Sequence, residues 1–324
     1  MYLGIEIGGT KLQLGVGPGD GSPLVAFERQ EIDPREGATG ILRQIRELGE
    51  SLLRQHAIRR IGIGFGGPVN ARLGSVIKSH QVAGWENMPL VEWCRDVLGV
   101  GTVLGNDCDV AALAEARCGA GRGRRAVFYV TVGTGIGGGF VCHGQLYGEG
   151  RPAVAEIGHL RPGLDADRPQ STVESRASGP AIAAEARRRV IQASGAEKPL
   201  ADDLLRRCHG SLEQLTARLV GDAAQAGNEL AQDVLRRSWR VLGWAIAQVV
   251  TLLAPEIVIV GGGLSLLGQR WFFQPLRDEV ARYVFPPLSD SFEIAPAELG
   301  ERVVVHGALT LARSSEPAEP AAGG

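Results

Sequence analysis

The sequence of 324 residues has no long apolar run, no charge excess and no cysteine pattern. Its longest apolar stretch, around residues 245–254, contains Gln248 and is too short to span a bilayer. A formal net charge of −2 argues against a broad basic surface, so we expect neither a membrane nor a nucleic-acid partner. No signal-peptide pattern precedes the first predicted strand, and we expect a cytoplasmic protein.

The cysteines give no indication of disulfide bonds. The five cysteines are scattered, odd in number and form no C-x-x-C pair. This pattern indicates neither a disulfide framework nor a cysteine-based metal site, and free thiols agree with a cytoplasmic location. Two nucleotide-binding signatures are also absent: no G-x-G-x-x-G follows the first strand, and no Walker loop occurs.

Two glycine turns are the most informative features that are present. They lie at residues 5–11 (IEIGGTK) and 132–139 (VGTGIGGG), and each interrupts an apolar stretch that is typical of a strand. Glycine lets the backbone turn its N–H groups toward an anion, and the accompanying threonine adds a hydroxyl donor. Two such turns in one chain suggest that a polyphosphate is held from both sides.

The remaining pattern favours an α/β fold. Alternating apolar residues predict a hairpin over residues 3–16, and a similar hairpin over 128–144 hints at two related α/β halves. Helical spacing predicts helices at 39–55, 181–193, 212–226 and 230–253, and a buried strand at 256–263 enters a third glycine turn. At this length we expect two lobes with a cleft between them.

Two local features stay ambiguous on pattern alone. Glu6 precedes the first glycine turn and is either a solvated edge residue or a carboxylate on the side of a metal ion. Asn106 or Asp107 could cap the helix that follows through Val110 and Leu113.

Taken together, the motifs resemble the ROK family of sugar kinases and sugar-responsive repressors within the actin-like, hexokinase-like ATPase superfamily. The matching segments occur in the family's order over nearly the whole chain: residues 4–11, 64–69, 106–107, 133–139, 156–159 (EIGH) and 255–263. The resemblance implies two actin-like (ribonuclease H-like) α/β lobes around a central cleft. We expect a small lobe over 1–118 completed by a helix at 305–313, a large lobe over 119–304 and a disordered tail at 314–324.

The same resemblance implies roles for individual residues. Mg-ATP would be held by Glu6, Gly8, Gly9, Thr10 and Lys11, by Gly133, Thr134 and Gly135, and by Gly261, Gly262 and Gly263 near the adenosine. Asp107 matches the catalytic base that accepts the proton of a sugar hydroxyl. The sugar would contact Gly67, Asn106, Glu156, His159 and Glu174. His80 could also touch the substrate, although a solvent-facing role fits it better.

The chain departs from the family at two places. Family members often carry zinc-binding cysteines where this chain has Asp165, Asp167 and Thr172, so we expect no structural zinc. These oxygen donors leave open only a hard-cation site, and hydrogen bonds or packing would then orient His159 and Glu174. The second departure is Glu6, where the family usually has aspartate; a water-mediated contact to Mg²⁺ could absorb the longer side chain.

The sequence therefore predicts an ATP-dependent hexose kinase, with glucose favoured on family grounds and phosphate transferred to its 6-hydroxyl. Fructose, mannose, N-acetylmannosamine and N-acetylglucosamine are alternative substrates, and polyphosphate is an alternative donor. A non-catalytic sugar sensor is a further alternative. A DNA-binding repressor is not expected, because only Met1 to Ile5 precede Glu6. Family habit and the apolar helix with Trp239 and Trp244 also suggest a homodimer.

Overall fold

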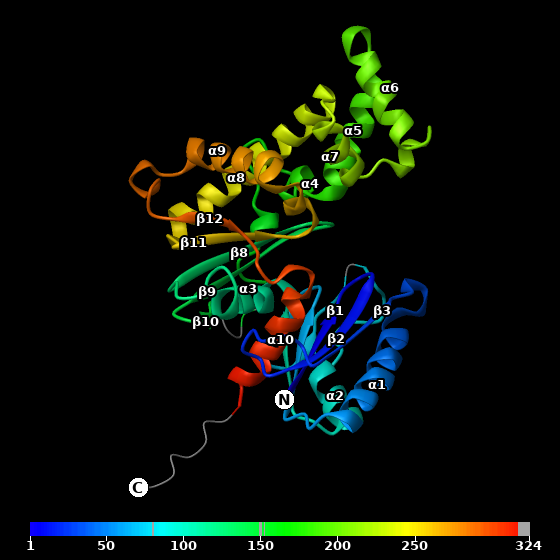
Figure 1. The fold of residues 1–324 in the computed structure, drawn as a ribbon, viewed down its shortest axis with the longest axis vertical. Helices are drawn as coiled ribbons and strands as arrows, with labels where there is room; N and C mark the ends of the chain where they lie inside the picture. Colours follow the sequence, from blue (N-terminus) through cyan, green and yellow to red (C-terminus); the bar gives the residue numbers. More distant parts are fainter. Residues whose placement is uncertain (80, 149–150, 152, 317–324) are drawn as a thin grey trace. The chain divides into compact units, whose positions relative to one another are not determined.

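Strands and helices alternate along the chain, and the expected α/β class is confirmed (Figure 1). The computed structural model describes residues 1–79, 81–148, 151 and 153–316. The chain forms two compact units: unit 1 comprises residues 1–129, 139–155 and 297–324, and unit 2 comprises 130–138 and 156–296. These units have other boundaries than the expected lobes at 1–118 and 119–304, and the lobe assignment stays a prediction.

The first sheet contains the predicted N-terminal hairpin at its centre. Its strand order is β3-β2-β1-β4-β7, with bounds β1 Tyr2–Ile7, β2 Lys11–Gly17, β3 Ala26–Glu31, β4 Arg60–Phe65 and β7 Thr102–Asn106. β1 pairs antiparallel with β2 and parallel with β4, so it is an interior strand. Its position brings the turn after β1 beside the carboxyl ends of β4 and β7, where ligand-binding residues gather in α/β sheets.

Strand β1 is buried on both faces rather than on one. Helices α1 (Gly37–Gln55) and α2 (Leu90–Leu98) belong to the core on one side. Helices α3 (Asp107–Cys118) and α10 (Val303–Ser314) pack together, and α10 contacts β1 and β4. Glu6 is consequently only 8% exposed, and the interpretation of Glu6 as a solvated edge residue is wrong.

Helix α10 approaches strands β1 and β4 and helix α3 so closely that only glycine fits at three contacts. A Cβ atom added to Gly62 would lie 1.9 Å from the Ala308 carbonyl oxygen. The same atom on Gly307 would lie 1.9 Å from the Val110 carbonyl oxygen, and on Gly4 it would lie 2.6 Å from that of Val305. The C-terminal helix is therefore an integral part of unit 1. Ser314 is its last residue, so the expected disordered tail begins too early; residues 317–324 lie outside the described residues.

The second sheet repeats the order of the first. It runs β10-β9-β8-β11-β12, with bounds β8 Ala126–Val132, β9 Ile136–Cys142, β10 Gln145–Leu146, β11 Ile257–Gly261 and β12 Glu293–Pro296. In both sheets the first three strands along the chain lie in reverse order, and the fourth and fifth extend the other edge. This repetition agrees with the expectation of two related halves. A small ribbon pairs β5 (Val69–Asn70) with β6 (Ser75–Val76).

Helices of unit 2 correspond to the segments predicted at 181–193, 212–226 and 230–253, the second of them with a correction, whereas the other helices of this unit were not predicted. Their bounds are α4 Glu174–Ala177, α5 Gly179–Gln192, α6 Lys198–Arg207, α7 Ala217–Gln225, α8 Glu229–Leu253 and α9 Gln274–Tyr283. The continuous helix predicted over 212–226 is wrong: a 3₁₀ turn at Leu212–Gln214 precedes α7. The side chain of Thr216 accepts the N–H of Leu219 at 3.3 Å and caps α7 there.

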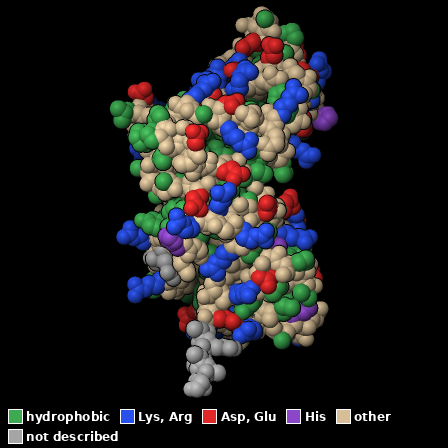
Figure 2. Space-filling model, turned by 60° about the vertical axis from the view of Figure 1, so that its left-hand side comes forward, with side chains coloured by type: hydrophobic (Ala, Val, Ile, Leu, Met, Phe, Trp, Pro, Cys, Tyr) green, Lys and Arg blue, Asp and Glu red, His purple; other side chains and the backbone are tan. Residues whose placement is uncertain are grey.

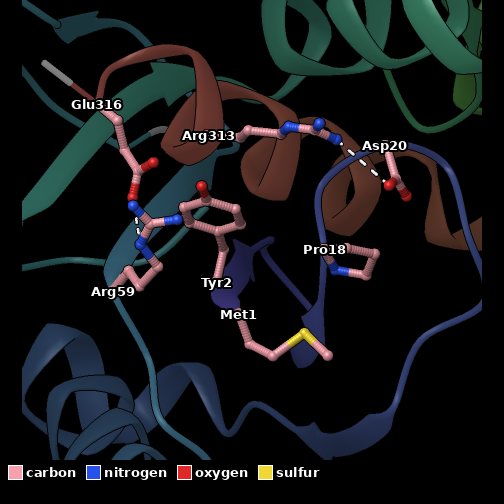
Figure 3. Close-up of a pocket in the computed structure, with 7 residues that line it drawn as sticks. All are labelled: Met1, Tyr2, Pro18, Asp20, Arg59, Arg313 and Glu316. Atoms are coloured by element: carbon pink, nitrogen blue, oxygen red, sulfur yellow. Dashed lines mark ion pairs between the residues drawn. The ribbon is translucent and has the colours of Figure 1, made fainter. Parts of the chain in front are cut away.

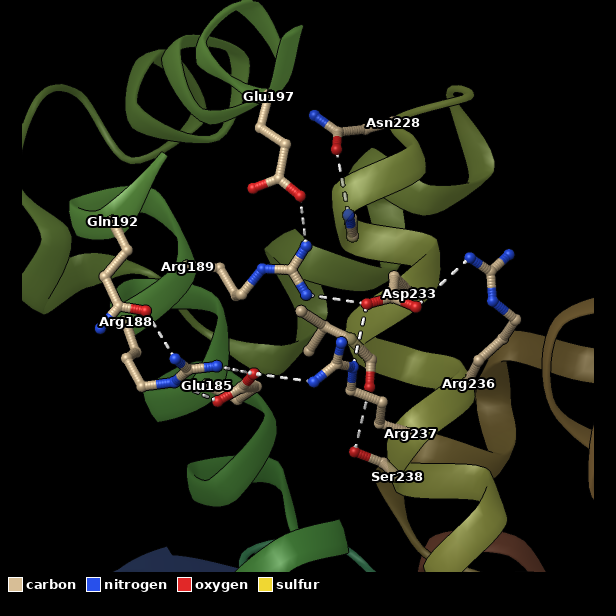
Figure 4. Close-up of polar contacts among 12 residues, drawn as sticks. Glu185, Arg188, Arg189, Gln192, Glu197, Asn228, Asp233, Arg236, Arg237 and Ser238 are labelled. Atoms are coloured by element: carbon tan, nitrogen blue, oxygen red, sulfur yellow. Dashed lines mark hydrogen bonds and ion pairs between the residues drawn. The ribbon is translucent and has the colours of Figure 1, made fainter. Parts of the chain in front are cut away.

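A network of ion pairs joins α5 to α8 (Figure 4). Arg189 contacts Asp233 at 2.8 Å and Glu197 at 2.7 Å, and Arg237 contacts the same Asp233 at 2.9 Å. The Arg189 side chain is only 14% exposed, whereas Arg237 and Glu197 are more open to solvent. Because one largely covered arginine is shared by two carboxylates, this network orients the helices more than an isolated surface pair would.

Helix α8 is a core helix along most of its length. Trp239 is buried, its Nε1 donates to the Trp271 carbonyl at 3.1 Å, and its ring packs edge-on against Phe272. No helix among the described residues has the length and apolar character needed to cross a membrane. On the face shown in Figure 2, basic and acidic side chains are interspersed, without a single basic patch.

Candidate functional site

The first glycine turn leaves two successive backbone donors available. Gly8 N–H donates to the Lys11 carbonyl at 3.1 Å and closes the turn. The N–H groups of Gly9 and Thr10 donate to no other group among the described residues. Successive backbone N–H groups in a turn can form a concave anion-binding site, so this turn can bind a phosphate group through its backbone.

A buried carboxylate lies directly before this turn. Glu6 Oε1 forms an ion pair with Lys11 Nζ at 3.2 Å, while Oε2 is buried and has no hydrogen-bond partner in the part of the chain described. Burial raises the pKa of Glu6, and the Lys11 ammonium opposes that rise. An unpaired, hard carboxylate oxygen beside a phosphate-binding turn fits a hydrated Mg²⁺ ion, because magnesium prefers oxygen ligands and retains water.

The question of which residue caps α3 is settled in favour of Asn106. Its Oδ1 accepts the N–H of Cys108 at 2.8 Å and of Asp109 at 3.4 Å, and its Nδ2 donates to the Gly67 carbonyl at 3.0 Å. Asp107 is the first residue of the helix. Since Asn106 provides the cap, the carboxylate of Asp107 is not required for that task.

Asp107 lies near the first glycine turn. Its Oδ1 accepts the Cys108 N–H at 2.8 Å. Its Oδ2 lies 3.4 Å from the position that a Cβ atom would take on Gly66, which is itself 3.6 Å from the Cα atom of Gly8. Burial raises the pKa of Asp107, and its hydrogen bond to Cys108 opposes the rise. A carboxylate of raised pKa beside a possible phosphate site can accept a proton from a hydroxyl group.

Gly66 and Gln81 lie beside the first glycine turn, and neither was predicted as a site residue from the sequence. Any side chain at Gly66 would occupy the space between the glycine turn and Asp107. Gln81 lies against Gly9, where a Cβ atom would overlap its amide group. The run Gly66-Gly67 was a usable signal for the first, whereas no local pattern marked Gln81.

Gly67 has both backbone groups engaged within unit 1. Its N–H donates to the Phe65 carbonyl at 2.9 Å and its own carbonyl accepts from Asn106. A direct backbone contact from Gly67 to a sugar stays a prediction. His80 lies outside the described residues.

The second glycine turn, like the first, is closed by a backbone hydrogen bond from its first glycine. Gly133 N–H donates to the Gly135 carbonyl at 2.9 Å, and the N–H groups of Thr134 and Gly135 have no acceptor among the residues that the structure describes. The turn is held at its two ends. The Gly133 carbonyl accepts from Gly179 N–H at 2.8 Å, and Ile136 N–H donates to Glu174 Oε2 at 2.7 Å.

Two further predicted segments lie beside this second turn. Gly158, between Glu156 and His159, packs so closely that a Cβ atom would lie 2.0 Å from the Ile136 carbonyl oxygen. Gly262 adopts φ +88° and lies against the backbone of Val132, and the N atom of Gly263 is 3.9 Å from the Cβ position of Gly133. Unit 2 therefore brings together the second turn, the Glu156–His159 segment, Glu174 and Gly261–Gly263.

The loop over 160–173 is closed by hydrogen bonds. Val173 N–H donates to the Leu160 carbonyl at 2.9 Å, and Thr172 and Ser175 exchange bonds between their side chains and backbones. Asp165 and Asp167 are exposed. Among described residues, no three His, Cys, Asp or Glu side chains are grouped closely enough to hold a metal ion.

A separate pocket lies in unit 1 near the N-terminus (Figure 3). Its volume is about 580 Å³, and its lining includes Tyr2, Asp20, Arg59, Arg313 and Glu316. Arg59 pairs with Glu316 at 3.0 Å and Arg313 with Asp20 at 3.3 Å, so the lining charges are mutually compensated. The pocket contains none of the predicted site residues.

Comparison with known proteins shows similarity over nearly the whole chain. The ROK family model matches residues 2–315. A glucokinase of Thermotoga maritima is 31% identical over 310 residues, covering 95% of this chain and 96% of its own. An N-acetylmannosamine kinase of Citrobacter koseri is 32% identical over 272 residues, covering 82% of this chain and 83% of its own.

A solved structure is similar over the same extent. The crystal structure of a ROK family glucokinase from Streptomyces griseus, in complex with glucose and AMPPNP, has a TM-score of 0.82 and 30% sequence identity. The match covers 97% of this chain and 99% of the other. This likeness confirms the expected actin-like α/β fold.

Proposed function

Because this chain belongs to the ROK family, we propose that it is an ATP-dependent hexose kinase whose substrate is glucose. Similarity to glucokinases over almost the full length supports the sugar-kinase activity. The geometric observation that carries the proposal is the position of Asp107, whose carboxylate lies near the first glycine turn, separated from it by the side-chain-free Gly66.

Asp107 acts as the general base in the proposed reaction. A sugar hydroxyl is a weak acid, and a carboxylate within hydrogen-bond distance accepts its proton as the oxygen attacks the γ-phosphorus. Burial raises the pKa of Asp107, which makes its ionised form a stronger base. Asn106, Gly67, Glu156, His159 and Glu174 are the proposed sugar contacts.

The two glycine turns are the proposed phosphate sites, with Thr10 and Thr134 adding hydroxyl donors and Gly261–Gly263 near the adenosine. Lys11 adds a positive charge beside the first turn. Glu6 is the residue proposed to hold Mg²⁺ through water, because its Oε2 is buried and unpaired among described residues. When bound, magnesium would offset the negative charge of the transferred phosphoryl group.

Replacing Asp107 tests the proposal. We expect Asp107→Asn to lower kcat for glucose phosphorylation by at least about 100-fold, because general-base catalysis contributes roughly 10²–10⁴-fold. Asp109→Asn removes a carboxylate from the same first turn of α3 and should keep most of the activity. The measurement is ADP release with glucose and Mg-ATP; an unchanged kcat in a folded Asp107→Asn protein would contradict the proposed base.

The choice of sugar and of phosphate donor is tested by a substrate panel. The 32% identity to an N-acetylmannosamine kinase makes amino sugars the main alternative, beside fructose and mannose. We expect the highest kcat/KM with glucose and ATP, and lower values with the other sugars and with polyphosphate. Sugar binding without any turnover would instead favour a sugar-sensing role.

The proposal also includes a cytoplasmic homodimer without nucleic-acid or membrane partners. Leu252 is 79% exposed at the end of α8, which supplies apolar surface for self-association. Light scattering after size-exclusion chromatography should give twice the monomer mass of 34.3 kDa. A monomer at micromolar concentration would reject the dimer and leave the kinase proposal intact.

A further inference from the structure

The segment from Glu174 to Gly179 holds both ends of the second glycine turn. Its first residue accepts the Ile136 N–H at 2.7 Å and its last donates to the Gly133 carbonyl at 2.8 Å. The free N–H groups of Thr134 and Gly135 lie between these two bonds. A short bond to a carboxylate is stronger than a neutral one, so Glu174 is the stronger of the two supports.

We propose that Glu174 is a positioning residue for the phosphate-binding turn, in addition to any contact it makes with the sugar. The inference deepens the proposed function and rests on it, because the second turn is taken to bind the phosphates of ATP. Glu174 does not contact the phosphates in this account. Its Oε2 fixes the backbone that does.

The residues next to the hydrogen bond between Glu174 and Ile136 leave room for it and support it. A Cβ atom on Gly135 would lie 2.8 Å from Glu174 Oε2, so glycine leaves the space that the carboxylate enters. On the other side, Ser178 N–H donates to the Glu174 carbonyl at 3.1 Å and the Ser178 side chain caps α5. These hydrogen bonds fix the backbone around Glu174, and its side chain extends from there to the turn.

The hydrogen bonds that close the 160–173 loop explain how Glu174 keeps its place in this chain. Val173, its immediate neighbour, is tied to Leu160, and Thr172 is bonded reciprocally to Ser175. These bonds flank Glu174 on both sides in the sequence. Neutral hydrogen bonds made by residues on either side of Glu174 therefore hold its carboxylate at the Ile136 N–H.

Direct measurement of nucleotide binding without sugar tests the inference. We expect Glu174→Ala to weaken the binding of AMPPNP, measured by calorimetry, by about tenfold, since a hydrogen bond to a charged group is lost. Glu174→Gln should recover most of the affinity, because its amide oxygen can accept the Ile136 N–H. Glu213→Ala, a truncation of an exposed glutamate in the same unit, should bind like the original chain.

A second variant reaches the same contact from the other side. Gly135→Ala should push the carboxylate away and weaken nucleotide binding, and combining it with Glu174→Ala should add little further loss. Unchanged AMPPNP affinity in folded Glu174→Ala would overturn the inference, as would a Gln variant no better than the Ala variant. If the original chain binds AMPPNP with the expected variant pattern but phosphorylates no sugar, the proposed function fails while the positioning role stands.

Discussion

At the scale of single residues, the buried carboxylate of Glu6 and the half-buried carboxylate of Asp107 near the first glycine turn are expected to reduce the stability of the fold. Asp107 and Glu6 both have raised pKa values because burial disfavours their charged forms, and the charge of Asp107 adds to the rise at Glu6. Stability alone would favour uncharged side chains at both positions. Such groups are typical of functional sites, where charge is kept for chemistry at a cost to folding.

Asp107→Asn should therefore stabilise the protein at neutral pH. The folded pKa of Asp107 lies above its unfolded value of about 3.9, so the original chain loses stability as pH rises from that value through the folded pKa. The variant has no such group. Urea unfolding at several pH values should show the variant gaining an advantage toward pH 8 and losing it toward pH 4.

The exposed Asp165 provides the control for this prediction. Asp165→Asn should unfold at the same urea concentration as the original chain, because its carboxylate is exposed. If Asp107→Asn were less stable than the original chain at pH 8, the view of Asp107 as a destabilising charge would have to be abandoned.

At the scale of elements, the packing of α10 on the first sheet depends on glycines. We expect Gly62→Ala to lower the free energy of unfolding by about 3 kcal/mol or more, because the added methyl group meets the rigid backbone of Ala308. Gly101→Ala is the matched control, since a Cβ atom there meets nothing within 4 Å. Equal thermal stability of the two variants would show that α10 can move away without cost.

Strongly periodic elements were predictable from the sequence, whereas the elements that they pack against were not. Helix α8 was expected at 230–253 and occupies Glu229–Leu253, because its apolar face repeats without interruption until Pro255. The last helix was expected at 305–313 and extends over Val303–Ser314. No local pattern could show that this helix covers β1, and so the burial of Glu6 was missed.

The candidate site was predictable as a set of motifs and not as a set of contacts. Glycine and threonine in a turn after a strand indicate backbone donors, which is how both turns were found. The bond from Ile136 to Glu174 joins residues 38 positions apart, and it depends on how the intervening loop closes. The choice between Asn106 and Asp107 as cap depended on a one-residue difference in where α3 begins, which propensity cannot resolve.

At the scale of the whole molecule, unit 1 is assembled from three separate stretches of the chain. We expect a chain ending at Pro296 to lose the ordered structure of unit 1, because α10 supplies buried side chains such as Val305 and Leu309. A chain ending at Glu316 retains α10 and should fold normally. Hydrogen exchange of β1 peptides would report the difference; full protection in the shorter chain would refute the expectation.

The position of α10 also has a consequence for biosynthesis. The ribosome makes β1 first and α10 last, so at about 5–20 residues per second the first strand waits roughly 15–60 s for its covering helix. During that time the face of β1 that carries Tyr2, Gly4 and Glu6 lacks its covering helix and remains open to chaperones and to other nascent chains. Protease treatment of stalled ribosome complexes should cut β1 until residue 314 has left the exit tunnel, and a circular permutant that begins with α10 should remove the delay.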